Sequence, residues 1–153
     1  GQFVLLSTSG NRATHLVLRG GRSGPNYSCT SIDGIARQWA HTAAPPPILV
    51  DCSHENSGKN PKRQPHIARA VMAQFARTDV DLMGVMLESH LREGRQACSP
   101  EAGPELSVTD ACLGFSETEA LLEELAEGSA RATNRPIRPE AMHRPALSGA
   151  SHR

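Results

Sequence analysis

Residues 48–75, ILVDCSHENSGKNPKRQPHIARAVMAQF, contain the pattern that decides the fold. The short apolar run at 48–52 predicts a buried strand, and the aperiodic polar stretch after it predicts a loop. Beyond the loop, apolar residues recur at i, i+4 and i+8, which predicts an amphipathic helix over about 63–77. These apolar residues are Ile67, Val71 and Phe75. The segment therefore predicts a strand, a loop and a helix in succession.

The same succession precedes and follows this segment. Upstream, a strand at 16–19 leads through a glycine-rich loop to a helix over about 30–41. Downstream, a strand at 82–87 leads through a long polar loop to a helix over about 116–126, with its leucines facing inward. Continuous apolar strands that alternate with helices are typical of a parallel sheet covered on both faces, with right-handed crossovers. The predicted fold class is therefore α/β, although three such units do not close an eight-stranded barrel.

The two ends of the chain differ from this pattern. Residues 3–8, FVLLST, predict a further strand, which the turn residues at 9–11 would join to the strand at 15–19 as a β-hairpin. From Gly128 onward the chain is rich in Arg, Pro, Ser and Ala and has no periodicity. We therefore expect one folded domain over 1–127 and a largely disordered tail over 128–153.

Composition excludes several classes of function. The 16 basic and 16 acidic residues of this 153-residue chain cancel, which argues against a general nucleic-acid binder. No apolar run approaches the roughly 20 residues that span a bilayer, and the N-terminus does not resemble a signal peptide. The four cysteines are widely spaced and form no CxxC pair, so we expect free thiols and a cytoplasmic protein. Only 3% of residues are aromatic, which suggests that part of the core is supplied from elsewhere.

Polar side chains follow each of the three predicted parallel strands. Arg19 follows the first strand, Asp51 and His54 the second, and Glu88 and His90 the third. Ligand sites of α/β folds lie at the carboxyl ends of the strands, so these side chains are expected to converge on one rim.

Two kinds of site are candidates at this rim. His54, Glu88 and Asp110 provide one nitrogen and two oxygen ligands for a divalent metal, although His54 could equally be a loop histidine bonded to backbone. Arg19 beside Gly20 and Gly21 could bind an anion, although paired glycines after a strand are often only a turn. Because no histidine lies beside it in sequence, we interpret Cys112 as a small buried residue and not as a nucleophile.

Four ordered segments resemble the microbial type I 3-deoxy-D-arabino-heptulosonate 7-phosphate (DAHP) synthases. They are LVLRGGRSGPNYS (16–28), LVDCSHENSGK (49–59), GVMLESHLREGRQ (84–96) and SVTDACLGFSETEALL (107–122). The resemblance covers roughly residues 1–127. It implies the C-terminal portion of a (β/α)₈ TIM barrel, namely the last three βα units and a preceding β-hairpin.

The family resemblance also implies an activity. These enzymes condense phosphoenolpyruvate with erythrose 4-phosphate and release phosphate, in the first step of the shikimate pathway. It implies that His54, Glu88 and Asp110 bind a divalent cation (Mn, Fe, Co or Zn). It further implies that Arg19 contacts the phosphate of phosphoenolpyruvate, that Arg19 and His54 are catalytic, and that Asp110 also contacts substrate. We further expect an aromatic amino acid effector near residues 3–18 and a homo-oligomer of the full-length protein. We expect no nucleic-acid or membrane partner.

The sequence also departs from the family pattern. A cysteine ligand and further substrate-binding arginines and lysines belong to family segments upstream of Gly1, and none of the four cysteines here lies in a matching motif. Cys52, Glu55 and Phe115 replace a usual aromatic, alanine and tryptophan, respectively. We therefore expect that this chain alone does not catalyse the reaction. A non-catalytic remnant or interaction module and a metal-dependent barrel hydrolase remain as alternative interpretations.

Overall fold

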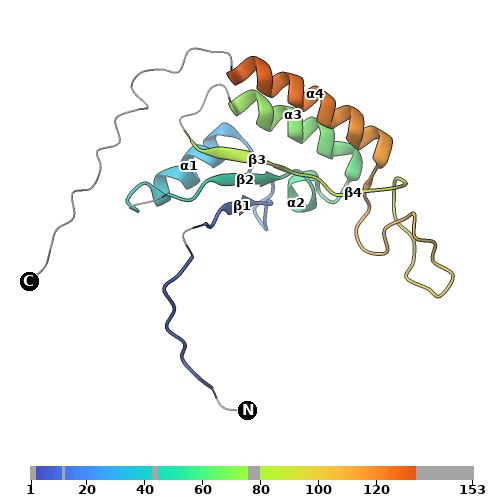
Figure 1. Ribbon diagram of the computed structural model, residues 1–153, viewed down its shortest axis with the longest axis horizontal. Helices are drawn as coiled ribbons and strands as arrows, with labels where there is room; N and C mark the ends of the chain where they lie inside the picture. The colour runs from blue at the N-terminus through green and yellow to red at the C-terminus, as the bar shows by residue number, and fades with distance from the viewer. Residues whose placement is uncertain (1–2, 12, 43–44, 76–79, 134–153) are drawn as a thin grey trace, which may run out of the picture.

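A parallel sheet forms the centre of the molecule. The computed structural model describes residues 3–11, 13–42, 45–75 and 80–133 (Figure 1). Within these ranges three strands lie in the order β1-β2-β3, all parallel. Their bounds are Leu16–Leu18 for β1, Ile48–Asp51 for β2 and Leu82–Met86 for β3. The predicted α/β pattern is confirmed, and the described residues form an open parallel sheet.

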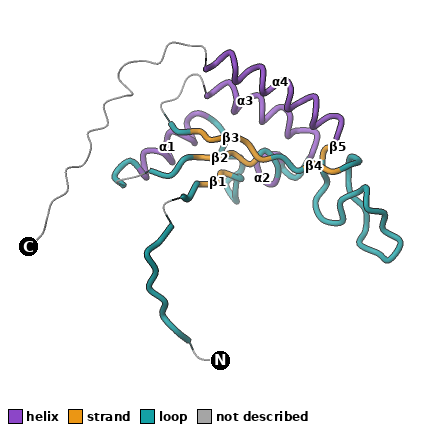
Figure 2. Tube along the Cα trace, in the orientation of Figure 1, coloured by secondary structure: helices purple, strands orange, loops and turns teal. Residues whose placement is uncertain are grey.

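The three predicted helices follow the three strands. They are α1 (Cys29–Trp39), α3 (Gln64–Phe75) and α4 (Phe115–Thr133), and α3 and α4 pack side by side above the sheet (Figures 1 and 2). Ser28 caps α1, because its Oγ accepts a hydrogen bond of 3.2 Å from the Ser31 amide. In the part of the chain that the structure describes, no helix is long and apolar enough to cross a membrane.

The core lies between one face of the sheet and the helices. It consists of Leu18, Ile48, Val50 and Leu82 from the strands and Ile32, Ile67, Val71, Leu121 and Leu125 from the helices. The expectation of a sheet covered on both faces is wrong for the described residues, because strand residues Val17 and Met83 are 40% and 52% exposed. Leu122, expected to face inward, is also exposed. An exposed apolar sheet surface of this kind agrees with the expectation that other residues complete the core.

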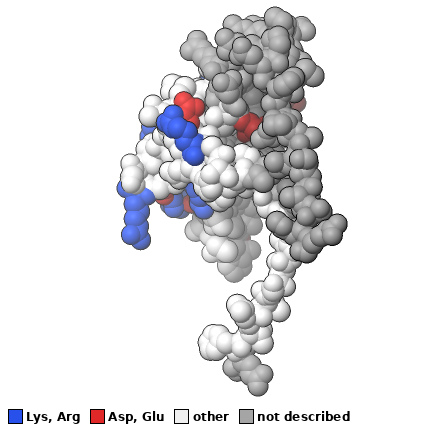
Figure 3. Space-filling model, turned by 90° about the vertical axis from the view of Figure 1, so that its left-hand side faces the viewer, with Lys and Arg blue, Asp and Glu red and all other residues white. Residues whose placement is uncertain are grey.

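The predicted N-terminal β-hairpin is not formed. Residues 3–8 have no strand structure, and among the described residues β1 pairs only with β2. Phe3 and Leu5 are fully exposed, and the segment projects away from the body of the molecule (Figures 1 and 3). A two-stranded hairpin is only marginally stable unless one face packs on a core, and this segment contacts no such core in the described ranges. Strand propensity alone therefore gave a wrong prediction here.

Helix α4 extends past the predicted start of the tail. It continues through Gly128 to Thr133, so residues 128–133 are helical and that boundary of the predicted tail is wrong. A helical glycine costs about 1 kcal/mol relative to alanine. Here it lies against α3, since a Cβ at Gly128 would be 3.5 Å from Met72 Cγ. Packing on α3 therefore extends the helix, and the rest of the predicted tail, 134–153, lies outside the described residues.

Short elements that the sequence did not predict lie in the polar loops. Helix α2 (His54–Ser57) and a 3₁₀ turn at Pro61–Arg63 occupy the loop after β2. Strands β4 (Ser89–His90) and β5 (Leu113–Gly114) pair in parallel and close the loop after β3. Four residues or fewer are too short to produce a hydrophobic period, so sequence patterns do not detect them. His54 lies in α2, Glu88 directly precedes β4, and Asp110 lies shortly before β5.

The four cysteines are free thiols in two environments. Cys29 and Cys98 are exposed, whereas Cys52 and Cys112 are buried. Burial, together with the nearby Asp51 carboxylate, raises the pKa of Cys52 to about 12. Burial also raises the pKa of Cys112. Both buried thiols are therefore protonated, unreactive groups near neutral pH, as predicted for Cys112.

We expect a thiol-specific alkylating reagent at about pH 8 to modify Cys29 and Cys98 in the native protein and to spare the other two. Cys52 and Cys112 should react only after denaturant exposes them, because the thiolate is the reactive form. Peptide mass spectrometry of the labelled protein distinguishes the four sites. Rapid native labelling of Cys52 would contradict the burial described here.

Candidate metal centre

Three ionisable side chains converge at the carboxyl ends of the strands. One ligand atom from each of His54, Glu88 and Asp110 lies within 4.8 Å of the others. The His54 Nε2 atom is 3.4 Å from Glu88 Oε1 and 3.9 Å from Asp110 Oδ2. All three residues are partly buried. The structure therefore brings together the residues that the strand-end pattern selected.

The orientation of the His54 ring is set by Asp51, the last residue of β2. Nδ1 of His54 lies 2.7 Å from Asp51 Oδ2, and Asp51 Oδ1 accepts a 2.8 Å hydrogen bond from the Ser53 amide. Asp51 is buried, so its carboxylate has little competing solvation. It holds the ring with Nε2 directed at Glu88 and Asp110, as carboxylates commonly do for metal-binding histidines.

The Glu88 carboxylate is held on its other side by a serine. The Ser53 Oγ donates a hydrogen bond of 2.6 Å to Glu88 Oε2, which leaves Oε1 facing His54. Ser53 is itself buried, and it lies directly between Asp51 and the short helix α2 that begins at His54. Asp51 and Ser53 therefore orient the imidazole of His54 and the carboxylate of Glu88, respectively.

Asn56 joins the ends of β1 and β2. Its buried side-chain amide donates to Leu18 O at 2.9 Å and to Asp51 O at 2.7 Å. Its Oδ1 accepts a 2.8 Å hydrogen bond from the Asn26 amide, in the glycine-rich loop after β1. The two strand ends and this loop are thus fixed relative to α2 by a single side chain.

The glycine-rich loop packs against α2 at Gly20. This residue has a φ of +78°, and a Cβ there would lie 2.8 Å from the Asn56 nitrogen and from the Glu55 carbonyl carbon. The space beside Gly20 is therefore occupied by the backbone of α2 and not left free for an anion. Arg19 precedes this contact, and its carbonyl accepts from the Asn56 amide at 3.2 Å. Its side chain is exposed, and its guanidinium has no ion pair among the described residues.

The other strand-end candidates do not join the cluster. His90 Nδ1 lies 2.6 Å from the carbonyl oxygen of Glu105, so this imidazole bonds to the backbone of the loop after β4. Cys112 is buried, and its Sγ donates to Asp110 O at 3.5 Å. Its backbone pairs with Gly94, which fixes the turn that presents Asp110.

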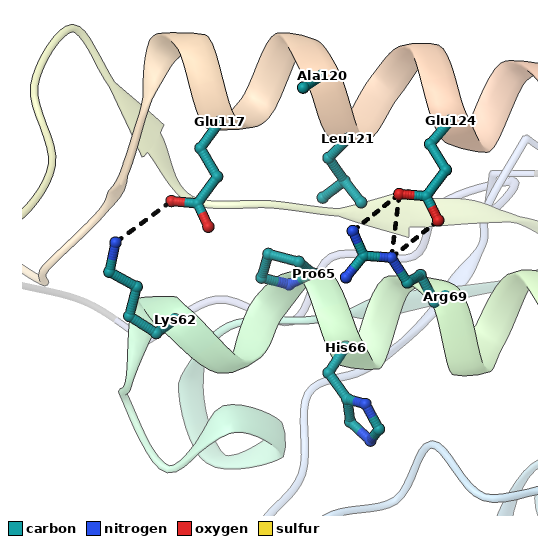
Figure 4. A pocket seen from close by; sticks show the side chains of 8 residues that line it. All are labelled: Lys62, Pro65, His66, Arg69, Glu117, Ala120, Leu121 and Glu124. Carbon is teal, nitrogen blue, oxygen red and sulfur yellow. Dashed lines mark hydrogen bonds and ion pairs between the residues drawn. The ribbon is translucent and has the colours of Figure 1, made fainter.

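A separate cavity of about 290 Å³ lies between α3 and α4, away from the strand ends (Figure 4). Ion pairs cross it from Arg69 to Glu124 at 2.8 Å and from Lys62 to Glu117 at 3.5 Å. The first is bidentate, but these side chains are about half exposed, so such pairs contribute little to stability. The cavity is a helix-packing gap bridged by charges and shares no residue with the cluster.

The donor set of the cluster fits a divalent cation. With the Nδ1 proton directed at Asp51, His54 presents the Nε2 lone pair to two carboxylates. Three electron-rich atoms at this separation repel one another unless a cation or a proton lies between them. One imidazole and two carboxylates are a donor set that suits divalent transition metals. Asp110, whose side chain is 38% exposed, leaves one side of the group open to solvent.

Sequence reasoning did not assign the residues that support the cluster. Ser53 and Asn56 are buried although they lie in the predicted polar loop, and Gln64 is buried although it is a polar residue at the start of the predicted helix. For Ser53 and Asn56 the available signal was their position within two residues of His54, just after an apolar strand. A polar side chain can be buried and support a site only when its hydrogen bonds are made inside the protein. Those bonds depend on tertiary contacts, which local sequence does not show.

Comparison with known proteins identifies the family. The model of the DAHP synthetase I family matches residues 2–123, so the chain belongs to this family. The tyrosine-inhibited phospho-2-dehydro-3-deoxyheptonate aldolase of Schizosaccharomyces pombe is 37% identical over 133 residues, which cover 83% of this chain and 36% of that protein. The phenylalanine-inhibited aldolase of Saccharomyces cerevisiae is 40% identical over 137 residues, which cover 84% of this chain and 37% of the yeast protein.

A solved structure agrees with this assignment. The phospho-2-dehydro-3-deoxyheptonate aldolase of Francisella tularensis superposes with a TM-score of 0.74 at 36% identity, over 80% of this chain and 36% of that structure. The chain thus spans little more than a third of the length of the relatives that it matches.

We expect Gly20→Ala to destabilise the protein by about 2 kcal/mol or more, because the positive φ and the 2.8 Å approach to α2 both penalise a Cβ. Gly21→Ala is the matched control, since a Cβ there meets nothing within 4 Å. Denaturant unfolding monitored by circular dichroism measures both. Equal stabilities of the two variants would contradict the described packing of the loop on α2.

Proposed function

We propose that this chain forms the metal-binding portion of a 3-deoxy-7-phosphoheptulonate synthase. The reaction condenses phosphoenolpyruvate with D-erythrose 4-phosphate to give DAHP and phosphate, in the shikimate pathway of aromatic amino acid biosynthesis. The observation that carries the proposal is the convergence of His54, Glu88 and Asp110 in a chain of this family. The proposed setting is the cytoplasm, in keeping with the free thiols.

In this proposal His54, Glu88 and Asp110 hold a divalent cation, with Mn, Fe, Co and Zn as the candidates. When bound, such a cation supplies Lewis-acid polarisation of the erythrose 4-phosphate carbonyl. Asp51 keeps the imidazole in the required orientation, and Ser53 does the same for Glu88. Asp110, at the open side of the cluster, is the residue placed to contact substrate as well.

Arg19 is proposed to bind the phosphate of phosphoenolpyruvate. Its exposed guanidinium follows β1 on the rim that carries the cluster, and a charge-assisted bond to phosphate would fix the orientation of the enol. The methylene carbon of phosphoenolpyruvate then forms a bond to the carbonyl carbon of erythrose 4-phosphate. Water adds at the former enol carbon, and phosphate leaves from the resulting tetrahedral centre.

An aromatic amino acid effector is proposed for the region of residues 3–18. Two relatives are named as inhibited by tyrosine and by phenylalanine, respectively. In this chain the region includes the exposed apolar side chains of Phe3, Val4, Leu5 and Leu6, which an apolar ligand or a partner surface would cover. The same exposure is consistent with a homo-oligomer of the complete protein.

A non-catalytic interaction module is the second candidate. It is favoured by the exposed apolar strand residues Val17 and Met83. A metal-dependent hydrolase could also use the His54 cluster, but it would have no need for Arg19. The two experiments below separate these functions.

We expect the chain alone to be inactive, and a fusion of it to the upstream part of the Saccharomyces cerevisiae relative to be active. The assay is the loss of phosphoenolpyruvate absorbance that depends on erythrose 4-phosphate, and a chelator should abolish it. The control joins the same upstream part to the carboxyl-terminal part of the yeast protein. An active control beside a metal-loaded but inactive fusion would favour the interaction module.

In an active fusion, we expect Arg19→Ala to raise the KM for phosphoenolpyruvate by about 10- to 100-fold, the loss typical of one charged hydrogen bond. Metal affinity, measured by calorimetry, should not change. Arg37→Ala, which removes an exposed arginine from α1, is the control. Unchanged kinetics in Arg19→Ala would remove this residue from the phosphoenolpyruvate site.

A further inference from the structure

Two buried glutamines lie near the two ends of α3. Gln64, its first residue, is fully buried, and Gln74 is 7% exposed. A buried amide is costly unless its hydrogen bonds are made inside the protein, so the partners of each indicate its role. Gln64 bonds to the backbone of one residue outside the helix, whereas Gln74 bonds to one backbone carbonyl outside the helix and to one within it.

The Gln64 side chain bonds twice to the backbone of Glu88. The Glu88 amide donates to Gln64 Oε1 at 2.8 Å, and Gln64 Nε2 donates to the Glu88 carbonyl at 3.2 Å. Glu88 lies two residues beyond the end of β3, where its backbone has left the sheet. A carboxamide that both accepts from and donates to one residue substitutes for a neighbouring strand. Together with the Leu113 amide, which donates to the same Glu88 carbonyl at 3.0 Å, it fixes the position of the Glu88 backbone.

The two ends of Glu88 are thus anchored by different elements. Gln64 holds its backbone from α3, and Ser53 holds Oε2 of its carboxylate from the turn after β2. Oε1 is left 3.4 Å from His54 Nε2. If the two bonds from Gln64 are lost, only the Leu113 amide still bonds to the Glu88 backbone, and the carboxylate becomes freer to move relative to the imidazole.

We propose that Gln64 is a positioning residue for the metal ligand Glu88, an inference that rests on the proposed function. It acts through the backbone of Glu88 and touches neither cation nor substrate. Its contribution is preorganisation: the carboxylate is held at the cluster before a cation arrives. Partners of this kind typically change metal affinity by 10- to 100-fold when they are removed.

Gln74 provides a matched control on the same helix. Its Nε2 donates to Tyr27 O at 2.9 Å and to Ala70 O at 3.1 Å, so it also makes two buried bonds to backbone. Neither partner belongs to the cluster. Gln64→Met and Gln74→Met each remove two such bonds while keeping the length of the side chain, and both should lower thermal stability.

The experiment titrates metal-free wild-type protein and both variants with Co²⁺ alone and records the visible absorption of the bound ion. Gln64→Met should bind Co²⁺ about tenfold or more weakly, with an altered spectrum. Gln74→Met should match the wild type in both readouts. Thermal unfolding followed by circular dichroism shows that the titration is made on folded protein.

The outcomes separate the inference from the proposed function. Equal affinities and spectra in Gln64→Met and Gln74→Met would overturn the inference and leave the metal site standing. Absence of Co²⁺ binding by the wild type would overturn the proposed metal site, and this inference with it. If Gln64→Met does not fold, Gln64→Glu keeps an acceptor for the Glu88 amide and should show an intermediate affinity. Wild-type affinity and spectrum in that variant would likewise overturn the inference.

Discussion

The carboxamide of Asn56 is the constraint on which the candidate site depends. It is fully buried, and it bonds to the ends of two parallel strands and to the glycine-rich loop that follows the first of them. Strand ends beyond the last ladder bond have unpaired backbone groups, which a buried environment does not tolerate. Asn56 supplies the missing partners and so determines where α2, and with it His54, can lie. The lack of a side chain at Gly20 allows the glycine-rich loop to approach the backbone of α2 at Glu55 and Asn56.

From this scaffold the electrostatics of the cluster follow. Two carboxylates and an imidazole nitrogen approach within 4.8 Å, an arrangement that mutual repulsion opposes. Nearby hydrogen bonds from buried groups hold it: Asp51 to the ring, Ser53 to one carboxylate and Gln64 to the backbone beneath that carboxylate. These bonds come from β2, the turn after it and α3, all within residues 48–75. The stretch that decides the fold therefore also determines the geometry of the site.

Sequence patterns predicted the parts of the structure that depend on local periodicity. The strands at Ile48–Asp51 and Leu82–Met86 and helix α3 were found because burial on a sheet or a helix face repeats along the chain. The trio of His54, Glu88 and Asp110 could be selected because parallel strands end on one side of a sheet. The expected strand at 3–8 failed because a strand needs a partner and a core, which propensity does not provide. The burial of Gln64 and Asn56 was not predicted, because no local sequence pattern distinguishes a buried side-chain amide from a solvated one.

The exposed face of the sheet and the cluster at its carboxyl ends differ in how far the described residues complete them. The apolar strand surface is left partly open, as the exposure of Val17 and Met83 shows. The cluster at the carboxyl ends is different. Every hydrogen bond that orients His54 and Glu88 comes from within this chain. The proposed cation would be held by this local network, whereas the proposed condensation of two phosphorylated substrates would need further positively charged side chains around them. Under the proposed function, metal binding and catalysis would therefore be separable, because the cluster and the hydrogen bonds that orient it lie within residues 51–110.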